Sequence, residues 1–185
     1  RRVLFRSAEA LADLGLSAPR IIARDVAAGF LLLEDLGDAT FTRLLAKGEA
    51  DGELYDLAVD VLVDLHSHPV DDIVPAGTPV YDDALFLQEA LLFPDWYLKA
   101  HLGDAAAAGR AAYEEIWTEL LPQARGVPET LVLRDFHVDN LMRIEGRDGV
   151  AACGLLDFQD TVRGPVAYDF VSLVEDARRD VAPAT

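Results

Sequence analysis

The chain has 185 residues, 51% of them hydrophobic, so it is long enough to bury a core of its own. Its 33 acidic residues against 16 Lys and Arg give a formal net charge of -17, which repels phosphate backbones and anionic lipid. The longest aliphatic run, Phe30–Leu33, is far too short to span a bilayer. We therefore expect no nucleic-acid partner, no membrane partner and a cytoplasmic protein, with the oligomeric state left open.

The N-terminal part alternates between helical and strand-like patterns. A helix is predicted over residues 8–14, followed by a hairpin whose strands are residues 20–24 and 30–34. After a linker, Thr40 is placed to cap a short helix. Between residues 51 and 68, apolar side chains recur at intervals of three and four, which predicts a central core helix.

The middle of the chain is predicted to be mainly helical. Residues 69–79 are rich in Pro, Gly and Asp and indicate a loop. Residues 84–102 return to helical spacing, with Pro94 expected to start a new turn or to kink the run, and residues 105–121 are predicted to form another helix. Four aromatic residues on the first of these segments are expected to lie in the core: Phe86, Phe93, Trp96 and Tyr97.

The C-terminal part changes to short strands. Runs with β propensity occupy residues 130–133, 140–144 and 150–158, and residues 146–149 form the turn between the last two. Residues 166–179 return to helical spacing. Carboxylates stand at the strand ends, where buried backbone gives way to a polar edge.

Three residues at these strand ends suit phosphoryl transfer. Asp135 and Asn140 are separated by 140 minus 135, or five positions, the interval between Asp and Asn in kinase catalytic loops. Asp157 follows on the next strand of the predicted hairpin, where kinases place a metal-binding Asp. A carboxylate beside the acceptor hydroxyl and oxygen ligands for Mg²⁺ are the groups this reaction needs. These residues therefore predict a kinase site.

The motifs around these residues resemble the aminoglycoside phosphotransferase and choline kinase superfamily. Residues 133–142 read Leu-Arg-Asp-Phe-His-Val-Asp-Asn-Leu-Met, against a family pattern of His-Gly-Asp-x-His-x-x-Asn. Residues 155–158 read Leu-Leu-Asp-Phe, and residues 164–170 read Gly-Pro-Val-Ala-Tyr-Asp-Phe, each similar to a family segment. The resemblance implies an α+β, protein-kinase-like fold, with a remnant of N-lobe strands and a mostly helical C-lobe that carries a catalytic β-hairpin.

The resemblance also implies roles for the central residues and for the cofactors, ATP and Mg²⁺. Asp135 would be the catalytic residue that accepts or orients the proton of the acceptor hydroxyl. Asn140 and Asp157 would hold Mg²⁺ against the β and γ phosphates of ATP. Backbone groups of Glu34 and Leu36 would meet the adenine.

Five further residues are expected around this centre. Arg134, His137 and Asp169 would support the catalytic loop, with Asp169 held by hydrogen bonds. Glu89 would contact hydroxyl groups of the substrate, with simple solvent exposure as the alternative. Arg163 would neutralise phosphate, or would pair with a neighbouring Asp.

Within the superfamily, residues 93–98, 154–160 and 173–180 look most like the anomeric N-acetylmuramate/N-acetylglucosamine kinases of peptidoglycan recycling. The resemblance thus implies an amino sugar as the small-molecule acceptor. An aminoglycoside, choline or another small alcohol is the alternative acceptor, and a non-catalytic kinase-like fragment is the alternative from a different class.

Both ends of the chain suggest a fragment. It starts without Met, and neither a Gly-rich phosphate loop nor a strand Lys precedes Ala8. We expect residues 1–37 to be the end of the N-lobe and the hinge, and residues 38–185 to be a C-lobe truncated at its C-terminus. The first His of the family's catalytic loop is Leu133 here, which leaves the carboxylate and the amide in place. We expect this chain alone to be inactive.

Overall fold

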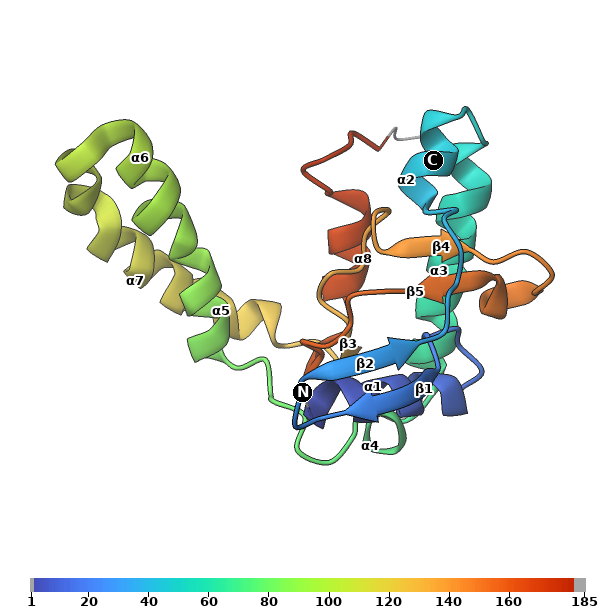
Figure 1. Ribbon diagram of the computed structural model, residues 1–185. Helices are drawn as coiled ribbons and strands as arrows, with labels where there is room; N and C mark the ends of the chain where they lie inside the picture. The colour runs from blue at the N-terminus through green and yellow to red at the C-terminus, as the bar shows by residue number, and fades with distance from the viewer. Residues whose placement is uncertain (1, 182–185) are drawn as a thin grey trace.

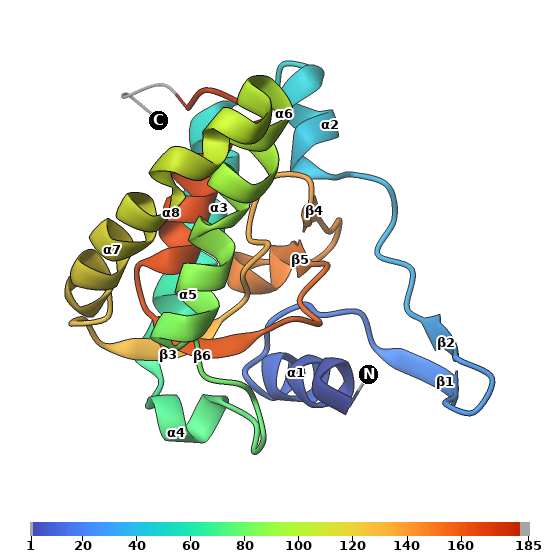
Figure 2. The ribbon, with the colours of Figure 1, turned by 90° about the vertical axis from the view of Figure 1, so that its left-hand side faces the viewer.

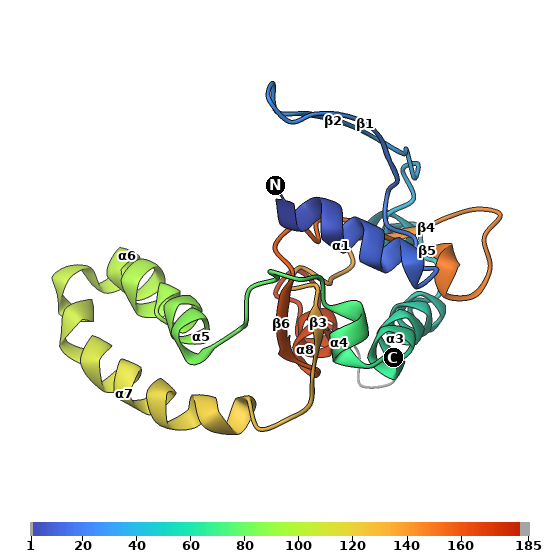
Figure 3. The same ribbon diagram turned by 90° about the horizontal axis from the view of Figure 1, so that it is seen from below.

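A computed structural model describes residues 2–181 of the chain; the expected C-terminal truncation point at Thr185 lies outside these residues. Most helices pack around a central body, from which a β-hairpin and a helical arm project in different directions (Figures 1 and 3). No helix in the described part of the chain combines the length and the apolar character needed to cross a bilayer.

The N-terminal region consists of a helix and the predicted hairpin. Helix α1 (Arg2–Asp13) begins earlier than expected and ends before Gly15, whose φ of 80° is a conformation that favours Gly. Strands β1 (Ile21–Asp25) and β2 (Phe30–Leu33) pair antiparallel, which confirms the hairpin. The hairpin projects away from the body (Figure 3). All four side chains of β2 are exposed.

The core is built on a long helix, as predicted. Thr40 caps α2 (Phe41–Ala46) by accepting a hydrogen bond from the backbone of Arg43. Helix α3 (Asp51–Ser67) then buries one face, because its apolar residues fall on the same side. The loop expected after it contains a short helix, α4 (Val70–Ile73), which the Pro and Gly content concealed. The buried residues of α3 are Leu54, Tyr55, Leu57, Ala58, Val61, Leu62 and Leu65.

The arm is a pair of helices joined by irregular turns. Helix α5 (Asp83–Ala90) leads into a π-helical turn, η1 (Phe93–Leu98), so a new turn starts beside Pro94 as expected. The chain continues through α6 (Lys99–Leu102) and a 3₁₀ turn, η2 (Gly103–Ala106), and then returns along α7 (Ala107–Ala124) (Figure 1).

The expectation that the aromatic residues of this arm lie in the core is wrong for three of the four. Trp96 is 73% exposed, Tyr97 56% and Phe93 45%. Phe86 is half-buried and stacks on Tyr81, with ring centroids 3.8 Å apart. The physical reason is that Phe93, Trp96 and Tyr97 lie on η1, whose main neighbours are α6, η2 and α7 of the same arm, and the arm projects from the body (Figure 3).

Two small sheets carry the C-terminal part. Strand β3 (Glu129–Val132) pairs antiparallel with β6 (Val162–Pro165), a strand that the sequence reading missed because it contains Gly and Pro. Strand β4 (Leu141–Arg143) pairs with β5 (Cys153–Leu155), which confirms the predicted catalytic hairpin. A 3₁₀ turn, η3 (Gly149–Ala152), precedes β5.

The last helix, α8 (Tyr168–Val174), is shorter than the predicted 166–179. It packs beside α3 (Figure 2). One buried cluster joins these elements, through Leu11 of α1, Leu54 of α3, Leu155 of β5 and Leu173 of α8. The segments that follow β3, β4 and β5 are therefore all attached to a single packed core.

Candidate active site

The loop between β3 and β4 carries Asp135 and Asn140. The Asn140 side chain donates from Nδ2 to the backbone carbonyl of Asp135 at 2.9 Å. Its backbone N–H donates to the carbonyl of His137 at 2.9 Å, and its Nδ2 lies 3.3 Å from Nε2 of the same residue. His137 itself is buried. Asn140 thus fixes the course of the loop that presents the exposed carboxylate of Asp135.

Asp169, in the first turn of α8, holds the other end of this loop. Its Oδ2 accepts a hydrogen bond from the backbone N–H of Leu133 at 2.7 Å, and its Oδ1 accepts one from Arg134 at 2.9 Å. The carboxyl is buried, and this burial raises its pKa to about 7, although the two hydrogen bonds act in the opposite direction. Asp169 therefore anchors the backbone directly before Asp135.

Two residues of the site have left-handed backbone conformations. Among the described non-glycine residues, only Arg134 and Asp157 have positive φ, at 72° and 58°. Such a conformation costs about 1–2 kcal/mol for a residue with a Cβ, and it is concentrated at functional sites. The sequence reading missed this strain. The available signal was that position 134 holds Arg where the family pattern has Gly.

The pairing of β4 with β5 brings Asp157 next to Asn140. Leu141 is opposite Leu155, and the backbone N–H of Leu156 donates to the carbonyl of Asn140 at 2.9 Å. Asp157 is the next residue, at the same end of the hairpin as Asn140. Its Oδ1 accepts a hydrogen bond from the side chain of Gln159. The structure thus assembles Asn140 and Asp157, together with Asp135, at one edge of the core.

These oxygen donors fit Mg²⁺ in the way that phosphoryl-transfer enzymes use it. The loop engages Nδ2 of Asn140, whereas within residues 2–181 no hydrogen bond engages its amide oxygen or Oδ2 of Asp157. The described residues contain no group of three or more His, Cys, Asp or Glu that would enclose a metal. Mg²⁺ bound with substrate phosphates needs only one or two protein side chains, since water and phosphate complete its shell.

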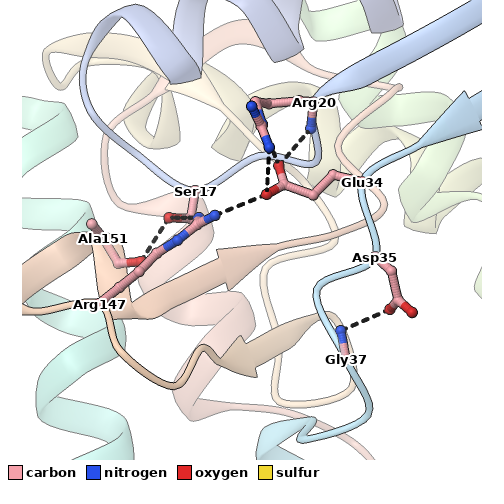
Figure 4. Close-up of polar contacts among 7 residues, drawn as sticks. All are labelled: Ser17, Arg20, Glu34, Asp35, Gly37, Arg147 and Ala151. Carbon is pink, nitrogen blue, oxygen red and sulfur yellow. Dashed lines mark hydrogen bonds and ion pairs between the residues drawn. The ribbon is translucent and has the colours of Figure 1, made fainter.

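The segment after β2 is fastened to the body through Glu34. This carboxylate accepts hydrogen bonds from Nε of Arg20 at 3.0 Å and from Nη2 of Arg147 at 3.0 Å (Figure 4). The hydrogen bond from Arg20 is the main reason that the pKa of Glu34 is lowered. Arg147 also donates to Ser17 at 2.7 Å, and Ser17 donates to the carbonyl of Ala151 at 2.6 Å. The hairpin is therefore tied to the connection between β4 and β5.

The backbone of the same segment keeps polar groups free. Asp35 accepts a hydrogen bond from the N–H of Gly37 at 2.8 Å, which shapes the turn (Figure 4). The carbonyl of Glu34 and the N–H of Leu36 have no hydrogen-bond partner within the described residues. The side chain of Leu36 lies over β5, since a Cβ on Gly154 would come within 3.0 Å of its Cδ1. This role of Gly154 was missed from the sequence.

A small cavity lies between the hairpin and Asp157. Its volume is about 140 Å³, and it combines apolar walls with one carboxylate. It therefore opens beside the proposed metal ligands. The walls include Pro19, Ile21 and Leu33 on one side and Leu156, Asp157 and Phe158 on the other.

A larger cavity lies between the arm and α8. Its volume is about 370 Å³, within the range of small-molecule pockets. Phe86 of α5 and Tyr168 of α8 line it, together with Ser172, whose hydroxyl lies 3.3 Å from the carbonyl of Arg134. One wall of this cavity thus touches the backbone of the catalytic loop.

The two residues expected to contact substrate have different surroundings. Glu89 receives hydrogen bonds from the guanidinium of Arg134 and from the hydroxyl of Tyr81, beside the catalytic loop. Arg163 pairs with Glu129 at 2.6 Å and with Asp71 at 2.9 Å, on the β3–β6 sheet. Arg163 therefore pairs with carboxylates, which is the second of its two predicted roles. The substrate contact of Glu89 stays a prediction, and both of its carboxylate oxygens already accept hydrogen bonds within the protein.

The fold and these polar groups define the class of the protein. A loop Asp and Asn between two strands, followed by an Asp on the next strand, is the arrangement of phosphotransferases with a kinase-like fold. The family model described as "Phosphotransferase enzyme family" matches residues 5–185. The chain belongs to this family.

Curated relatives are identical to this chain at more than a third of the aligned positions. The N-acetylmuramate/N-acetylglucosamine kinase of Pseudomonas aeruginosa is 41% identical over 177 residues, which cover 95% of this chain and 49% of that protein. The kinase of the same name from Caulobacter vibrioides is 38% identical over 178 residues, 91% of this chain and 48% of that protein. The chain thus spans about half the length of the curated relatives it matches.

Solved structures confirm the fold. The APH(2″)-IIa complex with gentamicin superposes with a TM-score of 0.65 over 96% of this chain and 60% of that chain, at 21% identity. The ADP-bound aminoglycoside phosphotransferase APH(2″)-Ib gives a TM-score of 0.60 over 96% and 62% of the two chains, at 22% identity. The predicted kinase-like α+β fold is confirmed, whereas the domain boundary after residue 37 stays a prediction.

Proposed function

We propose that the protein carrying this chain is an ATP- and Mg²⁺-dependent kinase that phosphorylates the anomeric hydroxyl of N-acetylmuramate or N-acetylglucosamine. The observation that carries the proposal is the β4–β5 register, which sets Asn140 beside Asp157 at the end of the loop that presents Asp135. The amino-sugar acceptor is favoured by the identity of 37–41% with kinases of that name. The proposal places this activity in the cytoplasm.

Asp135 is the group that meets the acceptor. Its carboxylate is exposed, and the hydrogen bonds of Asn140 and Asp169 hold the backbone on either side of it. In this role Asp135 orients the acceptor hydroxyl and accepts its proton as the new phosphate ester forms. A carboxylate fixed in this way loses little freedom on reaching the reactive geometry, which is the main contribution of kinases to catalysis.

Asn140 and Asp157 hold the metal–nucleotide complex. Bound Mg²⁺ neutralises the charge that develops on the transferred phosphoryl group. The cavity beside Asp157 receives the nucleotide, and the free backbone groups of Glu34 and Leu36 hydrogen-bond to adenine. Pro19, Ile21 and Leu33 give this side of the site the apolar surface that a purine ring requires.

The roles can be separated with two substitutions in the full-length protein. Asp135→Asn is expected to abolish phosphate transfer while Mg–ATP binding, measured by calorimetry, stays within about twofold of wild type. Asp157→Ala is expected to weaken Mg–ATP binding by about 100-fold, because a charged ligand is lost. Asp56→Asn, on the exposed face of α3, serves as the control that changes neither quantity. Unchanged turnover in Asp135→Asn would refute the assignment of the site.

The acceptor is tested with a panel of hydroxyl compounds. N-acetylmuramate, N-acetylglucosamine, an aminoglycoside and choline are incubated with ATP, and ³¹P NMR separates anomeric phosphate from ordinary phosphate esters. The proposal expects anomeric phosphate on the two amino sugars. Transfer to the aminoglycoside or to choline alone would instead favour the other acceptor class, to which the solved structures with bound aminoglycosides belong.

A further inference from the structure

The residue before Asp135 differs from its surroundings in both conformation and charge. Arg134 has a φ of 72°, although Gly accepts this conformation without strain and the family pattern has Gly here. The backbone bond from its N–H to Asp169 would form equally well with Gly, because no side-chain atom of residue 134 takes part. The contribution that Gly lacks is the guanidinium.

This guanidinium makes a half-buried network with the first helix of the arm. Its Nη2 pairs with Oε1 of Glu89, and the two side chains are 27% and 25% exposed. The other oxygen of Glu89 accepts a hydrogen bond from the hydroxyl of Tyr81. The guanidinium carbon also lies 5.9 Å from the ring centroid of Tyr81, within the range of a cation–π contact. Arg134 is thus held from two directions.

The helix that holds Arg134 also lines the larger cavity. Phe86 lies three residues before Glu89, so both side chains face the same side of α5. Tyr168 lines the same cavity and lies 5.1 Å from Tyr81, centroid to centroid. The network therefore connects a wall of the 370 Å³ cavity to the residue adjacent to Asp135.

We propose that Arg134 and Glu89 are a positioning pair, which couples the cavity wall on α5 to the carboxylate of Asp135. The acceptor enters between the arm and the catalytic loop, and the ion pair sets the distance between these two surfaces. Arg134 and Glu89 act through Asp135 and take no part in the transfer of protons or phosphate. The inference rests on the proposed kinase function and adds to it the residues that align the acceptor side.

Three variants of the full-length protein test the pair through steady-state kinetics. Arg134→Gly removes the guanidinium and relieves the left-handed backbone, so it is expected to be at least as stable as wild type. Glu89→Gln removes the charge of the partner and keeps an acceptor for Tyr81. Each is expected to lower kcat/KM for the acceptor about tenfold while KM for ATP changes less than about twofold. The double variant is expected to equal either single variant, because both remove the same interaction.

A second ion pair on α5 provides the matched control. Asp83 pairs with Arg125 at 2.8 Å, and Asp83→Asn removes one carboxylate from the same helix without touching the catalytic loop. It is expected to keep wild-type kinetics. Hydrogen exchange supplies a readout independent of turnover: amides of residues 133–140 should exchange faster in Glu89→Gln and Arg134→Gly than in Asp83→Asn.

The outcomes separate the inference from the function on which it rests. The positioning pair would be overturned if Arg134→Gly kept the wild-type kcat/KM, or if the losses of kcat/KM in the two single variants multiplied in the double variant. The kinase assignment would still stand if Asp135→Asn had lost turnover. Turnover that survives Asp135→Asn would overturn both. A tenfold loss shared by the two single variants and the double variant, without a loss of stability, supports the pair.

Discussion

The buried carboxyl of Asp169 allows the anchoring of the catalytic loop to be tested quantitatively. Asp169→Ala removes the acceptor of two backbone N–H groups, those of Leu133 at 2.7 Å and Arg134 at 2.9 Å. Each buried N–H left without an acceptor costs about 1–3 kcal/mol, so the free energy of unfolding is expected to fall by about 2–6 kcal/mol. Asp169→Asn keeps the side-chain volume and one acceptor oxygen, and about half of this loss is expected.

The pH dependence separates the charge of Asp169 from its hydrogen bonds. Burial raises the pKa of this carboxyl from its ordinary value of 3.8 to about 7. An acid whose pKa is higher in the folded protein binds its proton more tightly there, so stability increases as pH falls from about 7 toward about 4. Between pH 8 and pH 5 the gain is about 2–3 kcal/mol in wild type, and Asp169→Asn has no such gain.

Urea unfolding followed by circular dichroism at these two pH values measures both effects. The difference in unfolding free energy between wild type and Asp169→Asn is expected to be larger at pH 5 than at pH 8, by about 2–3 kcal/mol. Asp56→Asn, on the exposed face of α3, is the control for a change of net charge. An equal difference at both pH values would refute the argument from burial, and an Asp169→Ala variant within about 1 kcal/mol of wild type would refute the anchor itself.

Two glycines and the carboxylate of Glu34 give further tests. Gly164→Ala places a Cβ 2.8 Å from that of Tyr81, so thermal unfolding should show a loss of about 1–3 kcal/mol from overpacking. Gly109→Ala, in α7 with no atom within 4 Å of the added Cβ, should instead gain up to about 1 kcal/mol; equal shifts in both would contradict this reasoning. Glu34→Gln weakens the tie to Arg147, and KM for ATP should rise about two- to fivefold with the acceptor KM unchanged. A change confined to the KM for the acceptor would refute a role of Glu34 in nucleotide binding.

The centre of the site could be predicted because its geometry is mostly local. Five positions separate Asp135 from Asn140, and residues 144–152 connect β4 directly to β5, so the chain itself brings Asn140 and Asp157 together. The core helix α3 was equally clear, because one periodic apolar face has to be buried whatever surrounds it. Features that are set by residues close together in sequence can be predicted without knowing which distant residues pack against them.

Features that depend on distant partners were missed or misjudged. Strand β6 exists because it pairs with β3, whereas its own Gly and Pro argue against a strand. The aromatic periodicity of the arm marks an apolar face correctly, but burial depends on what packs there, and Trp96 is 73% exposed. Arg163 carried two predicted roles because its partners, Glu129 and Asp71, lie far from it in sequence.

Arg134 combines a feature that is local in sequence with one that depends on a distant partner. The catalytic pattern specifies Gly at this position because the backbone there is left-handed, and the structure gives Arg134 that same conformation, with a φ of 72°. A residue with a Cβ persists in such a conformation only when its surroundings hold it. Sequence can therefore identify position 134 as one whose side chain has a tertiary partner. It cannot name Glu89, which lies 45 positions away on a helix oriented by the packing of the arm.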